Sequence, residues 1–222
     1  MTRKTRPVSW IAAVLKEFET FPEGARLICL AALTIAAEGG KADVAKPLRG
    51  LGTGVFEIAV PYRSDAFRVI YAVQLGEDIW VVPCVSEEID AGHQDAHARG
   101  RFDQKPFETI EGDVPMKGEK LDVTRGSGNV CRDLEHENAD IEQFKAILAA
   151  EIIKTLDRDG LSVRAAHSRT GFAAADFSRI RNADLGRFTI DRLMSIINRL
   201  GSRVEVKVRV RRAEAVAHQV TA

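Results

Sequence analysis

The stretch from Leu161 to Asn182 constrains the fold of this chain more than any other part. Ser162 is a good N-cap for a first short helix, and Gly171 stands where a helix can end in a left-handed residue. A second helix would then turn Phe177 and Ile180 inward. The pattern predicts two short helices joined by a tight turn. This is the layout of a helix-turn-helix, and it also fits a plain helix pair in an ordinary bundle.

Basic residues are concentrated on and after this stretch, although the whole chain carries no net charge. The 222 residues include 32 Lys and Arg against 32 Asp and Glu. Residues 160–222 hold twelve basic and five acidic side chains, a net charge of +7, whereas residues 83–115 hold three and eight, a net charge of −5. A basic region of this kind is typical of a nucleic-acid face, and it is equally compatible with a solvated surface that has no partner.

The first third of the chain has the pattern of an α+β domain. Helices are predicted over Ala12–Glu19 and over Glu23–Glu38, the second of which follows a proline and is ended by two glycines. A turn is expected at residues 61–65. Two helices followed by an antiparallel β-meander are therefore expected. The predicted strands are Pro7–Ile11, Val55–Val60, Ala66–Gln74 and Asp78–Val85.

The second half of the chain has helical spacing outside its last segment. A long helix is predicted over Ala139–Asp159, and another runs from its N-cap Thr189 to Gly201. Residues Val204–Val210 alternate as a strand, V-E-V-K-V-R-V. A lone strand at a domain end needs a partner, and we expect its twin in a second chain. The second half should thus be an all-α domain with a C-terminal β-strand, in a homodimer.

Cysteine and histidine usage favours neither disulfides nor metal. Cys29, Cys84 and Cys131 are far apart and odd in number, so no disulfide framework or metal pair is expected. His93 and His97 have a spacing that metal sites use, but their surroundings lack a helical apolar period. We expect no metal and no cofactor.

No segment is apolar over the length that a membrane span needs, and the first residues lack the apolar core of a signal peptide. A cytoplasmic location is therefore expected, at the nucleoid if the chain binds DNA.

Several motifs in residues 7–82 occur together in one toxin family. They are P-V-S-W, F-P-E, A-K-P-L-R-G-L-G-T-G-V-F-E-I and D-A-F-R-V-I-Y. The N-terminal part thereby resembles RelE/HigB-type toxins of the phage-derived kind, which are small ribosome-associated ribonucleases. The resemblance implies a RelE-like fold in which basic residues on the sheet hold mRNA phosphate, and it carries this role over to Lys46 and Arg68.

The basic Gln-Lys-Lys segment that this family has after its last strand is absent. Residues 83–109, acidic and poor in large apolar side chains, stand in its place. Back-translated with permitted codons and read one base later, Pro83–Ile89 can give R-A-F-Q-K-K-S. A single-base slip near the Pro83 codon would explain why the family's basic segment is replaced by an unrelated sequence. Because Glu87 and Glu88 would repel an RNA backbone where two lysines are needed, little or no nuclease activity is expected.

Motifs between Thr124 and Arg211 resemble HigA-type antitoxins of the XRE helix-turn-helix family. They are T-R-G-S-G-N-V-x-x-D-L, L-S-x-x-x-A, F-S-R-I-R-N, F-T-I-D-R-L-M and L-G-x-x-V-E-V. The resemblance implies a DNA-binding repressor whose second motif helix enters the major groove. Toxin-like and antitoxin-like parts are normally adjacent genes, so their order here fits a fusion by frame slip.

The two family resemblances together divide the chain into four parts. Residues 1–85 form a degenerate toxin-like domain, residues 86–123 a linker, residues 124–212 the helix-turn-helix domain and residues 213–222 a tail.

The exposed positions of the motif supply the candidate DNA contacts. Arg179 and Asn182 are expected to contact bases, and three further arginines to contact phosphates. The full predicted set is Ser162, Arg164, Arg169, Ala174, Ser178, Arg179, Arg181 and Asn182.

We nevertheless expect fewer side chains to contact bases here than in typical HigA-type antitoxins. Val163, Ala173 and Ala174 stand where the family usually has glutamine or a serine or threonine, and an alanine can at most touch a thymine methyl. Asp176 adds a negative charge to the same helix.

Three functions remain open at this stage. The first is a sequence-specific transcriptional repressor of toxin–antitoxin type, which carries an inactive toxin-like domain and binds a short inverted repeat in double-stranded DNA. The second is an mRNA endoribonuclease held inactive by intramolecular contact with its own inhibitor. The third is a non-functional gene remnant.

Overall fold

The computed structural model describes residues 5–48, 53–63, 65–73, 76–82 and 122–207. We call residues 5–82 the N-terminal half and residues 122–207 the C-terminal half. The frame-slip segment, the two histidines within it and the predicted tail lie outside the described residues, so those expectations stay predictions.

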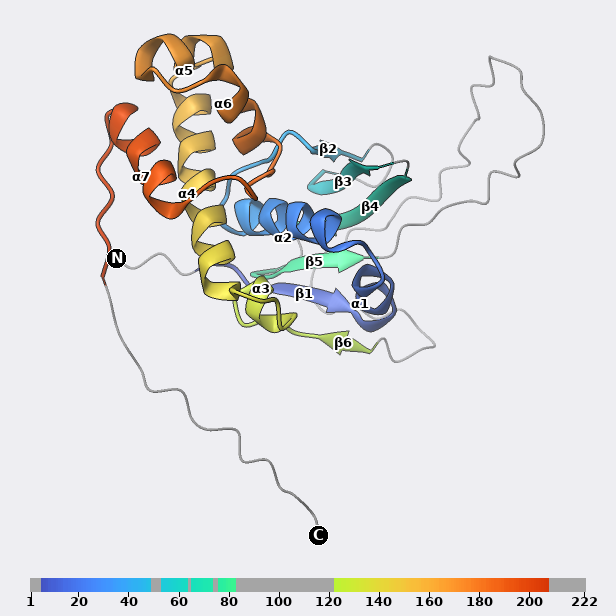
Figure 1. Ribbon diagram of the computed structural model, residues 1–222. Coiled ribbons are helices and arrows are strands. Elements are labelled where there is room, and N and C mark those ends of the chain that lie inside the picture. Colours follow the sequence, from blue (N-terminus) through green and yellow to red (C-terminus); the bar gives the residue numbers. More distant parts are fainter. Residues whose placement is uncertain (1–4, 49–52, 64, 74–75, 83–121, 208–222) are drawn as a thin grey trace, which may run out of the picture.

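The N-terminal half has the expected α+β character (Figure 1). Its two helices agree with the predicted ranges to within one residue. The strand β3 continues through Pro61 instead of turning there. The missing proline N–H costs nothing at this point, because β2 pairs only with residues 56–58 of β3 and leaves that side of Pro61 open. The elements are β1 (Val8–Ile11), α1 (Ala12–Glu19), α2 (Glu23–Ala37), β2 (Ala45–Pro47), β3 (Val55–Tyr62), β4 (Asp65–Ala72) and β5 (Ile79–Val82).

The expected antiparallel meander is confirmed as β3–β4–β5, and β1 joins it in parallel, so the whole sheet is mixed. Its strand order is β2-β3-β4-β5-β1-β6, with β1 parallel to β5. The edge strand β6 (Val123–Thr124) comes from the C-terminal half and pairs antiparallel with β1. The N-terminal half therefore does not close its own sheet, and a strand from beyond residue 121 completes it. Local periodicity predicts strands but carries no signal for which strands become neighbours.

Arg6 ties the start of the chain to the turn between β4 and β5. Its guanidinium donates hydrogen bonds to the carbonyl oxygens of Val73 (2.8 Å), Glu77 (2.8 Å) and Asp78 (2.9 Å). The fork of donors on one arginine can satisfy several turn carbonyls at once. This clamp fixes the register in which β1 enters the sheet beside β5.

The C-terminal half is helical, as expected. The predicted helices are confirmed with their caps, whereas Val204–Lys207 show no regular structure and the remainder of the predicted C-terminal strand lies outside the described residues. Among the described helices, none combines the length and the apolar character that crossing a membrane requires. The elements are α3 (Val130–Asp133), α4 (Ala139–Arg158), α5 (Val163–Thr170), α6 (Ala174–Arg181) and α7 (Ile190–Arg199).

The two halves share one hydrophobic core, and α2 lies at its centre. Figure 1 shows α2 between the sheet and α4. The facing side of α4 carries Ala146, Ala149 and Ala150, each 0% exposed, so the two helices can approach closely. Within this contact Thr34 Oγ1 donates to Gln143 Oε1 (3.2 Å), both buried. A helix that packs on both sides has to be apolar almost all round, which explains the alanine-rich sequence of α2.

Candidate nucleic-acid interface

The helix-turn-helix is built from the local signals that predicted it. The Ser162 side chain accepts a hydrogen bond from the backbone N–H of Ala165 (3.2 Å) and so caps α5. Gly171 has φ +81°, a conformation that glycine adopts without strain, and it closes α5. In α6, Phe177 and Ile180 are 0% exposed. The turn and these two anchors fix α6 across α4 and α5.

Three of the predicted DNA contacts lie on the exposed side of the motif. Arg164 and Ser178 are exposed. The Arg179 side chain is 37% exposed, and its nearest carboxylate oxygens lie 3.9 Å away on Asp176 and 3.8 Å away on Asp184. These distances are too long for hydrogen bonds, so the guanidinium keeps its donors for another partner.

Four other predicted contacts make side-chain hydrogen bonds within the protein: Ser162, which caps α5, and Arg169, Arg181 and Asn182. Arg169 donates to Asp159 Oδ2 (3.1 Å) and to the carbonyl of Leu200 (3.1 Å), which satisfies the end of α7. Hydrogen bonds from Arg158 and then from Arg169 hold the pKa of the Asp159 carboxyl below its ordinary value.

Asn182 and Ala174 mark the two ends of α6. Asn182 donates from Nδ2 to the carbonyl of Ser178 (2.8 Å) at its C-terminal end. Ala174 is the first residue of the helix and is half-buried.

Arg181 points toward the N-terminal half. Its Nη2 donates to Asp157 Oδ1 (2.7 Å), and its Nη1 lies 3.7 Å from Asp43 Oδ1. Only 17% of the Arg181 side chain is exposed. The predicted phosphate role of Arg181 would require this ion-pair network to open.

The negative charge that Asp176 brings to α6 is paired within the protein. Arg192, on α7, donates from Nη2 to Asp176 Oδ2 (2.7 Å), and only 13% of the Asp176 side chain is exposed. The same guanidinium lies over the ring of Phe172, 5.5 Å from its centroid. Sequence reasoning missed Arg192 because the pair is sixteen residues apart and depends on how α7 folds back.

Lys46 and Arg68, the positions carried over from the toxin resemblance, lie on neighbouring parts of one sheet face. Lys46 stands opposite Glu57 in the β2–β3 register, and Arg68 Nη1 forms an ion pair with the Glu57 carboxylate. A carboxylate therefore lies between the two cations, on the face where the resemblance expects phosphate.

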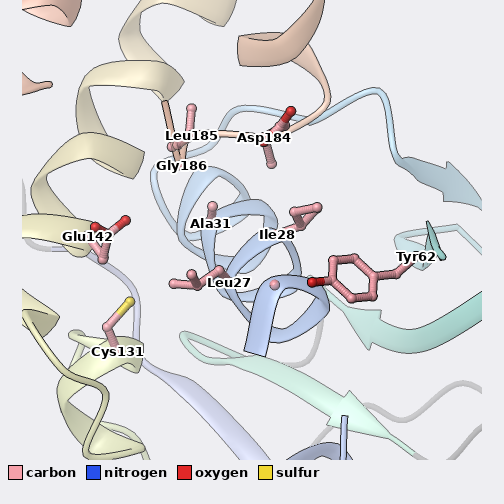
Figure 2. Close-up of a pocket in the computed structure, with 11 residues that line it drawn as sticks. Leu27, Ile28, Ala31, Tyr62, Cys131, Glu142, Asp184, Leu185 and Gly186 are labelled. Carbon is pink, nitrogen blue, oxygen red and sulfur yellow. The ribbon is translucent and has the colours of Figure 1, made fainter. Parts of the chain in front are cut away.

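An apolar groove of about 160 Å³ lies where the two halves meet (Figure 2). Leu27, Ile28 and Ala31 of α2 face the segment Ala183–Gly186, which follows the recognition helix α6. Tyr62, Cys131 and Glu142 complete the rim. The loop after α6 and the N-terminal half therefore face each other across this groove.

Both described cysteines should resist thiol reagents while the protein is folded. Burial raises the pKa of the Cys29 thiol to about 12, and burial, followed by the charges of Glu142 and Asp133, raises that of Cys131 to about 12. Because the thiolate is the reactive form, we expect alkylation of both at pH 8 only after unfolding. Mass spectrometry of native and urea-unfolded samples measures this. Rapid native labelling of Cys131 would instead mean that the groove opens.

Within the described ranges, no group of three or more His, Cys, Asp or Glu side chains is arranged to hold a metal ion.

Comparisons with known proteins separate the same two parts. Residues 130–209 match the family model described as a helix-turn-helix domain. A solved structure described as an XRE family transcriptional regulator is 35% identical, covering 39% of this chain and 100% of that one, with a TM-score of 0.33. The C-terminal half therefore contains a helix-turn-helix domain. Residues 16–86 match the model described as phage derived protein Gp49-like. No protein with a curated description matches the chain.

The chain thus joins a part that matches the Gp49-like model to a part that matches a helix-turn-helix model, and the resemblances seen in the sequence are confirmed. The helix-turn-helix assignment supports a role in DNA-binding transcriptional regulation. The individual DNA contacts stay predictions.

Proposed function

We propose that this protein is a sequence-specific transcriptional repressor of toxin–antitoxin type, whose toxin-like half has no nuclease activity. The observation that carries the proposal is the capped α5–Gly171–α6 unit, which leaves Arg164, Ser178 and Arg179 exposed along one motif. A recognition helix reads base edges with such side chains, while neighbouring cations hold phosphates.

The DNA site should be a short inverted repeat, read by a homodimer in the cytoplasm, at the nucleoid. Support for a dimer comes from the chain after α7. Val206 is 50% exposed, and the described residues of its segment pair with no strand of the same chain. A second copy of the alternating segment Val204–Val210 would supply the missing strand partner.

Loss of nuclease activity is supported by charge. Glu87 and Glu88 stand where the family has lysines. Carboxylates oppose the binding of a phosphodiester and the stabilisation of its charged transition state. Expression of the whole chain should therefore be harmless to a bacterial host.

Replacing Arg179 with alanine should weaken binding to the DNA fragment upstream of the gene by roughly 5- to 150-fold, the cost of about 1–3 kcal/mol typical of a lost base contact. Fluorescence anisotropy with a labelled duplex, at several salt concentrations, measures the change. Arg125→Ala is the matched control, because it removes the same charge from an exposed residue beside β6, far from α6. Equal affinities for Arg179→Ala and the wild type would contradict this contact, and absence of any wild-type binding would contradict the proposed function.

A further inference from the structure

The recognition helix α6 ends against the N-terminal half. The backbone N–H of Asp43, in the loop between α2 and β2, donates to the carbonyl of Arg181 (2.6 Å). The last carbonyls of a helix have no partner within the helix. Here the carbonyl of Arg181 accepts its hydrogen bond from Asp43, a residue that lies 138 positions earlier in the chain.

The side chain of Arg181 is held at the same place by two carboxylates. Asp157 at the end of α4 accepts a hydrogen bond of 2.7 Å, and Asp43 lies at 3.7 Å. The two carboxylate side chains are about half exposed, at 54% and 49%, while the arginine between them is 17% exposed. The guanidinium is therefore covered on both sides by acidic groups that remain in contact with water.

The two arginines of α6 are consequently not equivalent. Arg179 has no carboxylate oxygen within hydrogen-bond distance among its ion pairs, whereas Arg181 has one at 2.7 Å. A cation paired with carboxylates contributes little to the attraction of a phosphate until the pairs separate. Arg181 is thus hydrogen-bonded to Asp157 of the C-terminal half, and Asp43 of the N-terminal half adds a longer ion pair of 3.7 Å on the other side of the guanidinium.

We infer that the N-terminal half has a second role, as a built-in attenuator of DNA affinity. Asp43, with Asp157, competes with the DNA phosphate for Arg181. This inference rests on the proposed function, because it concerns the same DNA-binding helix. This role of the toxin-like half needs no nuclease chemistry. The charge of Asp43, together with that of Asp157, would lower the affinity of the helix-turn-helix for DNA.

The test is a set of isosteric variants of the full chain. The double variant Asp43→Asn/Asp157→Asn should bind the upstream DNA roughly eightfold more tightly at 0.1 M salt, since one added phosphate contact steepens the slope of log K against log salt by about 0.9. The gain should disappear when Arg181→Gln is added. For the single variant Asp43→Asn, Asp122→Asn is the matched control, because it also removes one negative charge, beside β6 at the opposite edge of the sheet from β2.

Each outcome decides the question. A gain that survives Arg181→Gln, or that Asp122→Asn equals, would overturn the inference in favour of a general charge effect. Weaker DNA binding by the double variant would overturn the inference, because it would show that the two carboxylates only hold α6 in position. The single variant Asp43→Asn keeps the 2.7 Å bond to Asp157 and should show a smaller gain of the same sign. Wild-type DNA binding that is present but unaffected by these variants rejects the attenuator alone, whereas absent wild-type binding rejects the proposed function.

Discussion

Phe177→Ala should lower the free energy of unfolding by about 3–5 kcal/mol and abolish DNA binding at 37 °C. Phe177 is 0% exposed and is one of the two side chains that anchor α6 to the core. Its truncation removes a large apolar contact and leaves a cavity that short helices on either side cannot fill. The recognition helix would then lose the orientation on which base reading depends.

The same variant tests whether the two halves unfold as one unit. Both tryptophans, Trp10 and Trp80, are in the N-terminal half, so their fluorescence reports on the sheet, whereas most of the helical circular dichroism comes from the C-terminal half. Because the core is continuous across α2 and α4, both signals should shift to the same lower urea concentration.

Ile141→Ala, at a side chain that is 44% exposed on α4, is the matched control and should leave both midpoints within about 0.5 kcal/mol of the wild type. A tryptophan transition that stays in place while the helical signal moves would show that the halves are independent.

The helix-turn-helix could be predicted from the sequence because its signals are local. Ser162 caps the helix that begins at the next residue, Gly171 adopts the left-handed conformation at the turn, and Thr189 caps α7 through the N–H of Arg192. Each of these acts within four residues of itself. The exposed face of the motif follows from the same periodicity.

What could not be predicted depends on residues far apart in the chain. The parallel pairing of β1 with β5, the strand β6 and the contact between Asp43 and Arg181 all join segments whose sequences carry no mark of one another. For this reason Arg181 was placed on the DNA side by periodicity, while the structure turns it toward carboxylates of both halves. Tertiary contacts decide the availability of a charged side chain, and a helical pattern gives only its side of the helix.

The joint between the halves also makes a strong prediction for a single glycine. A Cβ atom on Gly126 would lie 2.3 Å from the carbonyl oxygen of Val8 in β1 and 3.0 Å from the Asp133 carboxylate. The backbone of β1 cannot move aside without breaking its pairing with β5 and β6. The adjacent Ser127 is held in turn by Asp133, which accepts from its backbone N–H (2.8 Å) and its hydroxyl (2.6 Å). Neither the β1 backbone at Val8 nor the segment that contains Gly126 can therefore shift to make room for the Cβ atom.

Gly126→Ala should therefore lower the free energy of unfolding by about 1–3 kcal/mol, the usual cost of forcing an extra group into a packed site. Gly186→Ala is the matched control, because a Cβ there meets no atom within 4 Å, and it should be neutral or stabilising by up to about 1 kcal/mol. Urea titrations of both variants, followed by tryptophan fluorescence, compare them directly. If the two substitutions cost the same, β6 is not fastened to β1 as described, and the sheet of the N-terminal half must be complete without the strand that the C-terminal half contributes.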